Sequence, residues 1–470
     1  MMQIECLNSG DRRAAVLLGP QKLPPDGEKI RKSRFVCCQY SKGRYLLFHT
    51  LTRQLLALPP QLIDYFEDGR LFEAAILSDG IVSDLYRNYF LVPQNAAETE
   101  LYLELKDLLV IKEELPRSIT HYVVLPTSAC NARCFYCFEQ GMRYQKMSEE
   151  TLEDTLRFIL RHRPEGQGSI HLHWFGGEPL CAADHIRRIS RRLTEAGVRF
   201  DAEMTSNGSL FTEALAQEAA EAWKLSRIQI TLDGMAEEYA RRKRYAGGPT
   251  DPFGTVIRNI HFLLRAGIRV TIRLNTDENN LGEIYRTAGF LRDEFTEEER
   301  KNMHVYAHSL FAGSEDGQKA CPAGSGSDRL EARVLEINDY IQRLGLSVLD
   351  LSGLFTLSTH FCKVTAPECN VLIDAAGRLF ACDAMKETMC YGDVKTGIDP
   401  EAWKQVTAPC PVREECKACT FLPECTEFDR CPNRVPFDAC HSQKEREVHR
   451  KMRIAHEIYM DQARQAAEKE

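Results

Sequence analysis

Three cysteines stand close together at Cys130, Cys134 and Cys137, directly after the apolar run at 121–126. A loop this short can wrap three thiolates around one small inorganic cluster, which favours iron–sulfur chemistry over a role in folding alone. A closed structural zinc site needs four ligands, usually supplied as CxxC pairs, so a surface zinc loop is the weaker alternative. Three ligands therefore predict a cluster with one iron left open for another molecule.

The spacing of this triplet, with the aromatic Tyr136 just before its last cysteine, resembles the signature of the radical S-adenosylmethionine (SAM) enzymes. The resemblance implies a 4Fe–4S cluster whose open iron is chelated by the amino and carboxylate groups of SAM. It also implies that Tyr136 lies against the adenine. In this family, reductive cleavage of SAM gives a 5′-deoxyadenosyl radical that removes a hydrogen atom from an unactivated carbon.

The composition is that of a soluble globular protein, with 43% hydrophobic and 27% charged residues among 470, enough for two to three domains. The sequence has no membrane-length apolar run and no secretory signal at its start, so we expect a cytoplasmic protein. That compartment keeps thiols reduced, and the 18 cysteines are therefore expected to bind metal. A net charge of −8 gives no support for a nucleic-acid partner.

Six short strand candidates alternate with helical patterns from residue 121 to residue 344. Strict alternation predicts parallel βαβ units. Six units are too few for a closed eight-fold barrel, but they are similar to the partial, TIM-like (β/α)6 barrel of radical SAM enzymes. The predicted fold is therefore α/β, with strands at 121–126, 170–175, 200–205, 227–232, 269–275 and 304–308.

Catalytic residues of such barrels lie at the carboxyl ends of the strands, where this sequence carries short polar segments. The second strand is followed by Gly176, Gly177 and Glu178, which resemble the family's GGE motif and are implied to hold the SAM amino group. The next two strands end in Asn-Gly and Asp-Gly pairs, for which plain turn chemistry is the alternative. The resemblance implies that the residues there contact the ribose and carboxylate of SAM, namely Ser206, Asn207, Thr231 and Asp233.

Basic residues at 241–244 resemble the family's segment whose arginine binds the SAM carboxylate, and Arg242 is the favoured candidate in a register left open. On the fifth strand, Arg273 and Asn275 share one face. An unpaired arginine inside a barrel is costly, so this pair predicts a bound anion or a substrate.

Ten cysteines crowd between residues 362 and 440, and metal is expected to hold this segment together. The spacings around Cys382 and from Cys416 to Cys425 are similar to the SPASM domain, which carries two auxiliary 4Fe–4S clusters and would bring the total to three. The resemblance implies Cys362, Cys369, Cys382 and Cys431 for the first auxiliary cluster, and Cys416, Cys419, Cys425 and Cys440 for the second.

The register of these ligands departs from the family pattern in two places. Five residues separate Cys425 from Cys431, and the gap to Cys440 is short. Cys390 and Cys410 are left over as alternates. A zinc ribbon is the competing interpretation of Cys416 and Cys419.

The expected domains are an α+β region at 1–115, the barrel at 116–350, the SPASM domain at 351–441 and a surface helix at 442–470. Residues 35–58 predict a hairpin, and helices are expected at 59–66, 71–77, 83–89 and 100–114. This N-terminal region is similar to small domains that hold the leader of a precursor peptide. Plain scaffolding is an equal alternative.

The resemblance implies a maturase that installs a thioether or carbon–carbon crosslink in a ribosomally made precursor peptide, with a flavodoxin or ferredoxin as electron donor. Sulfatase maturation, which oxidises Cys or Ser to formylglycine, is the alternative within enzymes. In those enzymes an aspartate at the position of Asp383 serves as a general base, although a structural role beside a cluster is also expected there. A non-catalytic iron–sulfur electron carrier is the alternative of another class.

Overall fold

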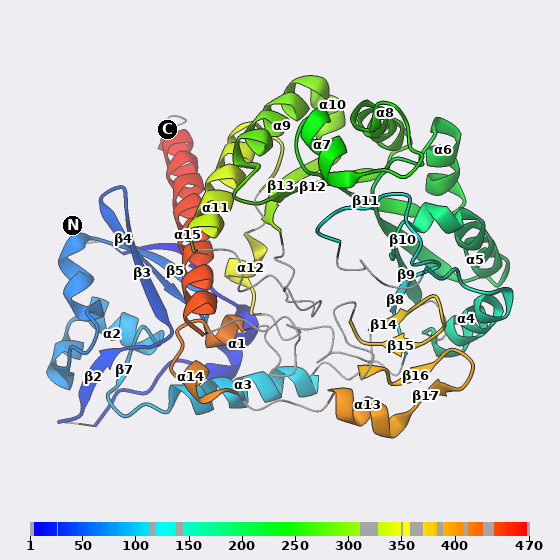
Figure 1. Cartoon of the computed structure of the whole chain (residues 1–470). Helices are drawn as coiled ribbons and strands as arrows, with labels where there is room; N and C mark the ends of the chain where they lie inside the picture. The colour runs from blue at the N-terminus through cyan, green and yellow to red at the C-terminus, as the bar shows by residue number, and fades with distance from the viewer. Residues whose placement is uncertain are drawn as a thin grey trace.

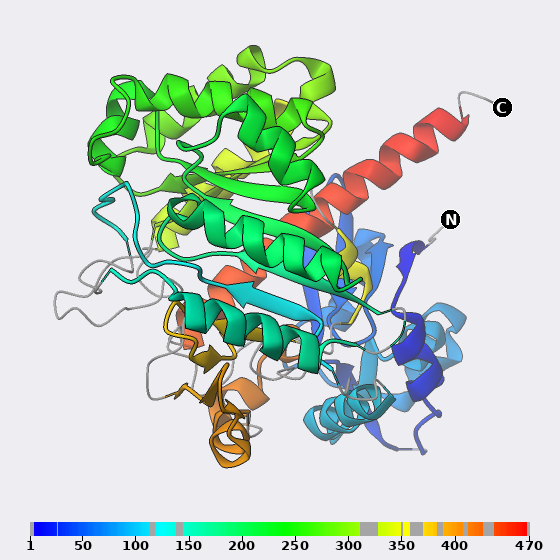
Figure 2. The same cartoon turned by 90° about the vertical axis from the view of Figure 1, so that its right-hand side faces the viewer.

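The computed structural model shows an arc of strands covered by helices, with a smaller β region and a long C-terminal helix at its side (Figures 1 and 2). Among the described residues, no helix is both long enough and apolar enough to span a membrane. The described residues are 4–25, 27–112, 118–137, 144–164, 166, 168–310, 328–348, 351–357, 370–382, 389–407, 412–425 and 437–467.

Six parallel strands form the body of the largest sheet, and each pairs with the next one along the chain. Alternate residues of each strand are buried under the helices, as Ile228, Ile230 and Leu232 are, because successive side chains point to opposite faces. The predicted six-stranded α/β arrangement is therefore confirmed. The strands are β8 (His121–Val124), β9 (Ser169–Trp174), β10 (Arg199–Ser206), β11 (Leu225–Leu232), β12 (Arg269–Thr276) and β13 (Met303–Ser309).

Helices lie on the outer side of this arc (Figure 1). Polar side chains cap several of them at the N-terminus, as Ser148 caps α4 and Thr212 caps α6. Because the helices cover the outer face of the sheet, we expect a binding site at the strand ends and on the inner face. The helices are α4 (Glu149–His162), α5 (Ala183–Glu195), α6 (Glu213–Glu221), α7 (Ala236–Lys243), α8 (Pro252–Arg265), α9 (Leu281–Glu294), α10 (Glu297–Arg300) and α11 (Asp328–Arg343).

Two strands from the C-terminal part of the chain extend the barrel sheet beyond β8. Strand β14 (Asn370–Ile373) pairs in parallel with β8, with Asn370 opposite His121, and β15 (Leu379–Phe380) returns antiparallel to it. The sequence did not predict this extension, because strands of four and two residues carry little periodicity. The remaining elements of this part are β16 (Gly392–Asp393), β17 (Gly397–Ile398), α12 (Ser352–Phe355), α13 (Pro400–Thr407) and α14 (Glu414–Lys417).

The N-terminal region contains two antiparallel sheets with the strand orders β1-β5-β4-β3 and β6-β2-β7. The predicted hairpin at 35–58 is present as β3, β4 and β5. The prediction of a helix over 71–77 is wrong. Strand β6 pairs with β2 in this segment, and a short 3₁₀ turn follows at Ala74–Ser78. The segment at Pro60–Phe66 is also 3₁₀. The bounds are β1 (Glu5–Ser9), α1 (Arg12–Leu18), β2 (Lys29–Lys32), β3 (Val36–Ser41), β4 (Arg44–His49), β5 (Gln54–Leu58), β6 (Phe72–Glu73), α2 (Gly80–Arg87), β7 (Leu91–Pro93) and α3 (Glu98–Lys112).

The C-terminal helix α15 (Phe437–Ala467) starts five residues before the predicted helix. It is not wholly a surface helix, since Val448 and Met452 are buried against apolar residues of β4 and β5. Its last turns are exposed and project from the molecule (Figure 2). The N-terminal sheet and the C-terminal segments therefore share one apolar core.

Candidate functional site

The loop at 130–137 leaves the carboxyl end of β8 and is tied to the end of α7. The amide of Arg133 donates to the carbonyl oxygens of Lys243 at 2.9 Å and of Arg244 at 3.1 Å. The amide of Cys137 donates to the carbonyl of Cys134 at 3.1 Å, which turns the chain tightly between the two cysteines. All three cysteines are half-buried, and burial raises the pKa of the Cys130 thiol to about 12.

The glycines after β9 let that turn pack directly on the cysteine loop. A Cβ on Gly177 would lie 2.5 Å from the carbonyl oxygens of Ser128 and Ala129, and one on Gly176 would lie 2.4 Å from that of Thr127. Gly176 also has a φ of +118°, where residues with side chains are strained. Both glycines are therefore required by the approach of the two loops.

The carboxylate of Glu178 points inward and joins the ends of β9 and β10. It is fully buried and accepts hydrogen bonds from Leu180 N at 3.1 Å, Ser206 Oγ at 2.9 Å and Asn207 N at 2.8 Å. Burial raises its pKa despite these donors. Because the chain already supplies donors to both oxygens, the carboxylate acts as a brace, and only backbone carbonyls of this turn remain to meet an ammonium group.

Asn207 completes the brace by reaching the cysteine loop. Its Nδ2 donates to Asn131 Oδ1 at 2.8 Å and lies 3.9 Å from Cys130 Sγ. The predicted residues Gly176, Gly177, Glu178, Ser206 and Asn207 thus form one connected structure with the cysteine triplet.

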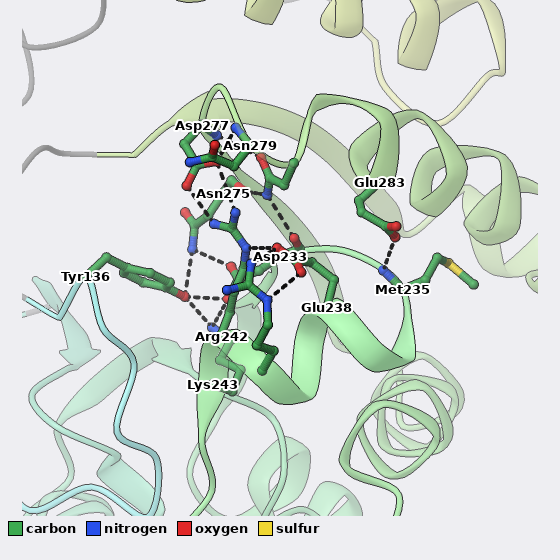
Figure 3. Close-up of polar contacts among 12 residues, drawn as sticks. Tyr136, Asp233, Met235, Glu238, Arg242, Lys243, Asn275, Asp277, Asn279 and Glu283 are labelled. Carbon is green, nitrogen blue, oxygen red and sulfur yellow. Dashed lines mark hydrogen bonds and ion pairs between the residues drawn. The ribbon is translucent and has the colours of Figure 1, made fainter.

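A second buried network lies at the carboxyl ends of β11 and β12 (Figure 3). Asp233 accepts from Tyr136 Oη at 2.6 Å through Oδ2 and from Asn275 Nδ2 at 2.9 Å through Oδ1. Lys243 Nζ donates to Tyr136 Oη at 2.8 Å and to Thr231 Oγ1 at 2.6 Å. Four residues predicted from different parts of the sequence therefore meet around one lysine.

Lys243 is one of the four basic candidates at 241–244, among which Arg242 was favoured. It is fully buried, and although burial alone would lower its pKa, the negative charge of Asp233 raises it well above the usual value. Tyr239 stands four residues earlier on α7 and is also fully buried, but so is Arg242, and burial therefore does not separate the two cations. What distinguishes Lys243 is its contact with Tyr136 and Thr231.

Arg242, the favoured candidate, points in another direction. Its guanidinium makes two hydrogen bonds to Asp277, at 2.8 and 3.0 Å, and another to Glu238, and it lies 5.4 Å from the centre of the Phe135 ring. It helps to line a hollow of about 490 Å³ beside the cysteine loop. Arg242 is thus held by two carboxylates, whereas Lys243 belongs to the central network.

Arg273 lies on the inner face of the sheet, as its pattern predicted. Its Nη2 is 3.2 Å from His308 Nδ1, and the neighbouring Tyr306 donates to Gln229 Oε1 at 3.0 Å. Burial lowers the pKa of His308, and the Arg273 charge lowers it further. The inner face therefore offers polar groups next to the network around Asn275.

The C-terminal cysteines are placed only in part. Cys382 is half-buried and lies two residues after the end of β15. Cys416 lies in the single turn of α14, and Cys419 and Cys425 follow it within nine residues, in the segment called here the Cys416–Cys425 loop. Cys390 Sγ is 3.2 Å from Gly392 O. Several of the predicted residues lie outside the described residues, namely Cys362, Cys369, Asp383, Cys431 and the spare Cys410.

The chemistry of the cysteine loop fits a cluster that it binds through sulfur. Three thiols lie on one tight turn, and the adjacent glycine turn leaves no room for side chains. Among the described residues, no three histidine, cysteine, aspartate or glutamate side chains already converge as they would around a single metal ion.

Comparison with known proteins gives a family for the central domain. Residues 124–291 match the model of the Radical SAM superfamily. The Fe-coproporphyrin III synthase of Methanosarcina barkeri is 26% identical over 187 residues, which are 40% of this chain and 43% of that protein. The GTP 3′,8-cyclase of Paracoccus denitrificans is 28% identical over 287 residues, which are 57% of this chain and 77% of that protein.

Several of the curated relatives are matched over about half of their length. Among solved structures, anSMEcpe with bound AdoMet and the Cp18Cys peptide is 17% identical, covers 72% of this chain and 99% of that one, and has a TM-score of 0.54. This likeness extends over the barrel and beyond it. The matched segment 124–291 spans the cysteine triplet, the glycine turn and the Lys243 network, so the part of the chain that forms the site is the part that matches the Radical SAM superfamily.

Proposed function

We propose that this protein is a radical SAM enzyme that modifies a peptide, installing a thioether or carbon–carbon crosslink in a ribosomally made precursor. The observation that carries the proposal is the attachment of the β14–β15 hairpin to β8, the strand that leads into the cysteine triplet. Cys382 follows this hairpin, so a cluster bound there would lie at the wall of the barrel.

In this proposal Cys130, Cys134 and Cys137 hold the first 4Fe–4S cluster. Together with SAM, that cluster supplies the 5′-deoxyadenosyl radical. The backbone of the Gly176–Gly177 turn faces the SAM amino group. The network of Lys243, Asp233 and Thr231 lies beside the carboxylate and ribose of SAM, and Arg242, which lines the hollow beside the cysteine loop, remains the candidate for binding the SAM carboxylate.

The C-terminal cysteines supply the ligands of the second auxiliary cluster in this proposal. Cys440 is followed by His441, whose ring centre lies 5.2 Å from that of Phe421 in the Cys416–Cys425 loop. This contact brings the start of α15 to that loop and supports Cys440 as the fourth ligand of the second auxiliary cluster. Two auxiliary clusters of the SPASM kind would accept the second electron when an oxidised crosslink forms.

A peptide substrate is supported by the structural neighbour, which was solved with a bound peptide. Curated relatives named GTP 3′,8-cyclase make a nucleotide the competing substrate class. The matches to the cyclases and to the family model cover only part of this chain. We therefore take the C-terminal cysteines as the feature that favours a peptide over a nucleotide substrate.

The test is an assay with the reconstituted enzyme, SAM, a reductant such as flavodoxin or ferredoxin, and candidate precursor peptides from neighbouring genes. A crosslinking maturase gives a peptide lighter by two hydrogens that does not react with aldehyde reagents. An aldehyde-bearing product would establish sulfatase-type maturation instead, with Asp383 as the candidate base. Turnover of GTP without any change in peptide mass would overturn the proposal.

A further inference from the structure

Side chains of the N-terminal region hold the loop that carries Cys416, Cys419 and Cys425. At the first point of contact, the carbonyl oxygen of Lys417 accepts hydrogen bonds from Arg34 Nη1 at 2.7 Å and from Thr99 Oγ1 at 2.9 Å. Arg34 precedes β3 and Thr99 lies in the first turn of α3. The loop is therefore fixed to two elements that are distant from it in sequence.

Two more contacts follow along the same loop. The carbonyl of Thr420 accepts from Thr50 Oγ1 at 2.6 Å, and Glu424 Oε1 accepts from Arg53 Nη1 at 2.7 Å. Thr50 is fully buried and Arg53 is 4% exposed, so water does not compete for these bonds. The turn between β4 and β5 thus supplies both donors.

Each of the three contact points lies on a residue directly next to one of the three cysteines. A hydrogen bond to the backbone carbonyl beside a cysteine, as at Lys417 and Thr420, restricts the backbone from which that Sγ projects, whereas Glu424 is held through its side chain. The held residues are Lys417, directly after Cys416, Thr420, directly after Cys419, and Glu424, directly before Cys425.

Apolar contacts press the loop onto the same region. Leu422 is buried among Phe35, Leu51 and Tyr102, and Phe421 packs in the core that contains Phe48. A loop that is buried between its cysteines cannot turn outward without exposing these side chains. Solvent exposure and hydrogen bonding also set the potential of an iron–sulfur cluster.

We propose that the N-terminal α+β region is the cradle of the second auxiliary cluster. Arg34, Thr50, Arg53 and Thr99 are positioning residues that fix the loop in the form that binds the cluster. This inference rests on the proposed function, which assigns a cluster to these cysteines. It gives the N-terminal region a role that requires no leader peptide.

The test compares two threonines of the same turn in the reconstituted full chain. The variants are made with alanine at positions 130, 134 and 137, so that only auxiliary clusters contribute. Thr50→Val removes the donor to Thr420, whereas Thr52→Val removes a buried hydroxyl that has no hydrogen-bond partner among the described residues. Iron and sulfide per chain, electron paramagnetic resonance and the rate of cluster loss to a chelator are measured.

Thr50→Val should lose its cluster about fivefold faster than Thr52→Val, the factor expected for one net hydrogen bond. Arg34→Met should behave like Thr50→Val, while Arg34→Lys, which keeps a donor, should retain the cluster. Arg44→Met on β4, whose guanidinium pairs with Glu5, is the arginine control. Cluster loss at the control rate in both Thr50→Val and Arg34→Met would overturn the cradle.

A further variant separates the two proposals. Cys416→Ala with Cys419→Ala should lose the iron of one cluster. If this double variant holds as much iron as the chain with alanine only at positions 130, 134 and 137, the Cys416–Cys425 loop binds no cluster, and that part of the proposed function fails. If it loses that iron while Thr50→Val matches its control, only the inference about the N-terminal region fails.

Discussion

Lys243 and Asp233 form an ion pair in which Nζ lies 3.4 Å from Oδ2 and both side chains are buried, at 2% and 0% exposure. Burial of two charges is favourable only when they meet each other and have further hydrogen bonds. Tyr136 and Thr231 provide those bonds. The pair therefore joins the cysteine loop to the ends of the strands.

Lys243→Met should destabilise the protein by about 3–5 kcal/mol, because it leaves the Asp233 carboxylate buried without a cation. Urea unfolding of the purified chain measures this loss. Adding Asp233→Asn to Lys243→Met should restore much of it, since both charges are then absent. Arg241→Met is the control on the same helix, because Arg241 is exposed and pairs with Glu238 at the surface. A loss no greater than that of Arg241→Met would contradict the buried pair.

Gly177→Ala should slow SAM cleavage by about five- to 150-fold. The new Cβ would meet the carbonyl oxygens of Ser128 and Ala129 at 2.5 Å, just before the cysteine loop, and overpacking of this kind costs about 1–3 kcal/mol, where 1.4 corresponds to a factor of ten. Formation of 5′-deoxyadenosine with a chemical reductant is the measurement. Gly282→Ala on α9, where a Cβ meets nothing within 4 Å, should leave the rate unchanged. Equal rates for the two variants would show that the turn does not press on the loop.

Glu178→Gln tests the brace between β9 and β10. The glutamine amide nitrogen cannot accept from Asn207 N or Leu180 N, and a buried donor without a partner costs about 1–3 kcal/mol. Thermal or urea unfolding should show this loss. Glu221→Gln, on the exposed side of α6, should show almost none, and a similar effect of both changes would remove the argument for a brace.

The sequence was sufficient for the six barrel strands because alternation and turn residues are local properties. It was also sufficient to gather the cysteine triplet, the glycine turn and Asp233, because parallel strands bring their carboxyl ends to one edge. It did not predict that β14 pairs with β8, since that register depends on contacts between segments about 250 residues apart.

The sequence also could not predict which partners Arg242 and Lys243 contact, although the two residues are neighbours on one helix. Neighbouring helical residues point about 100° apart, so the rotation of α7 decides which carboxylates each cation reaches. Both side chains are buried, but Arg242 reaches Glu238 and Asp277, while Lys243 reaches Asp233. Composition alone could not select between four consecutive basic residues.

The last prediction concerns His171 on the inner face of β9. Its Nδ1 is 2.8 Å from Asp201 Oδ2 and its Nε2 is 3.5 Å from Glu203 Oε1. The hydrogen bond to Glu203 is the main cause that raises the pKa of His171, and burial opposes it. The charged imidazole is thus favoured in the folded state, so its stabilisation is full below pH 6.5 and is lost as pH rises through the raised pKa.

His171→Gln should therefore reduce the free energy of unfolding most near pH 6, and the difference from the unchanged protein should shrink towards pH 9. Urea unfolding across this range measures it. His304 on β13 is the comparison, because burial lowers its pKa, so its contribution to stability rises with pH only up to about 6.5 and is level above that. The effect of His171→Gln should therefore shrink above pH 6.5, whereas the effect of His304→Gln should not, since one histidine is stabilised with its proton and the other without it. Parallel slopes would show that the carboxylates of β10 do not hold the charge of His171.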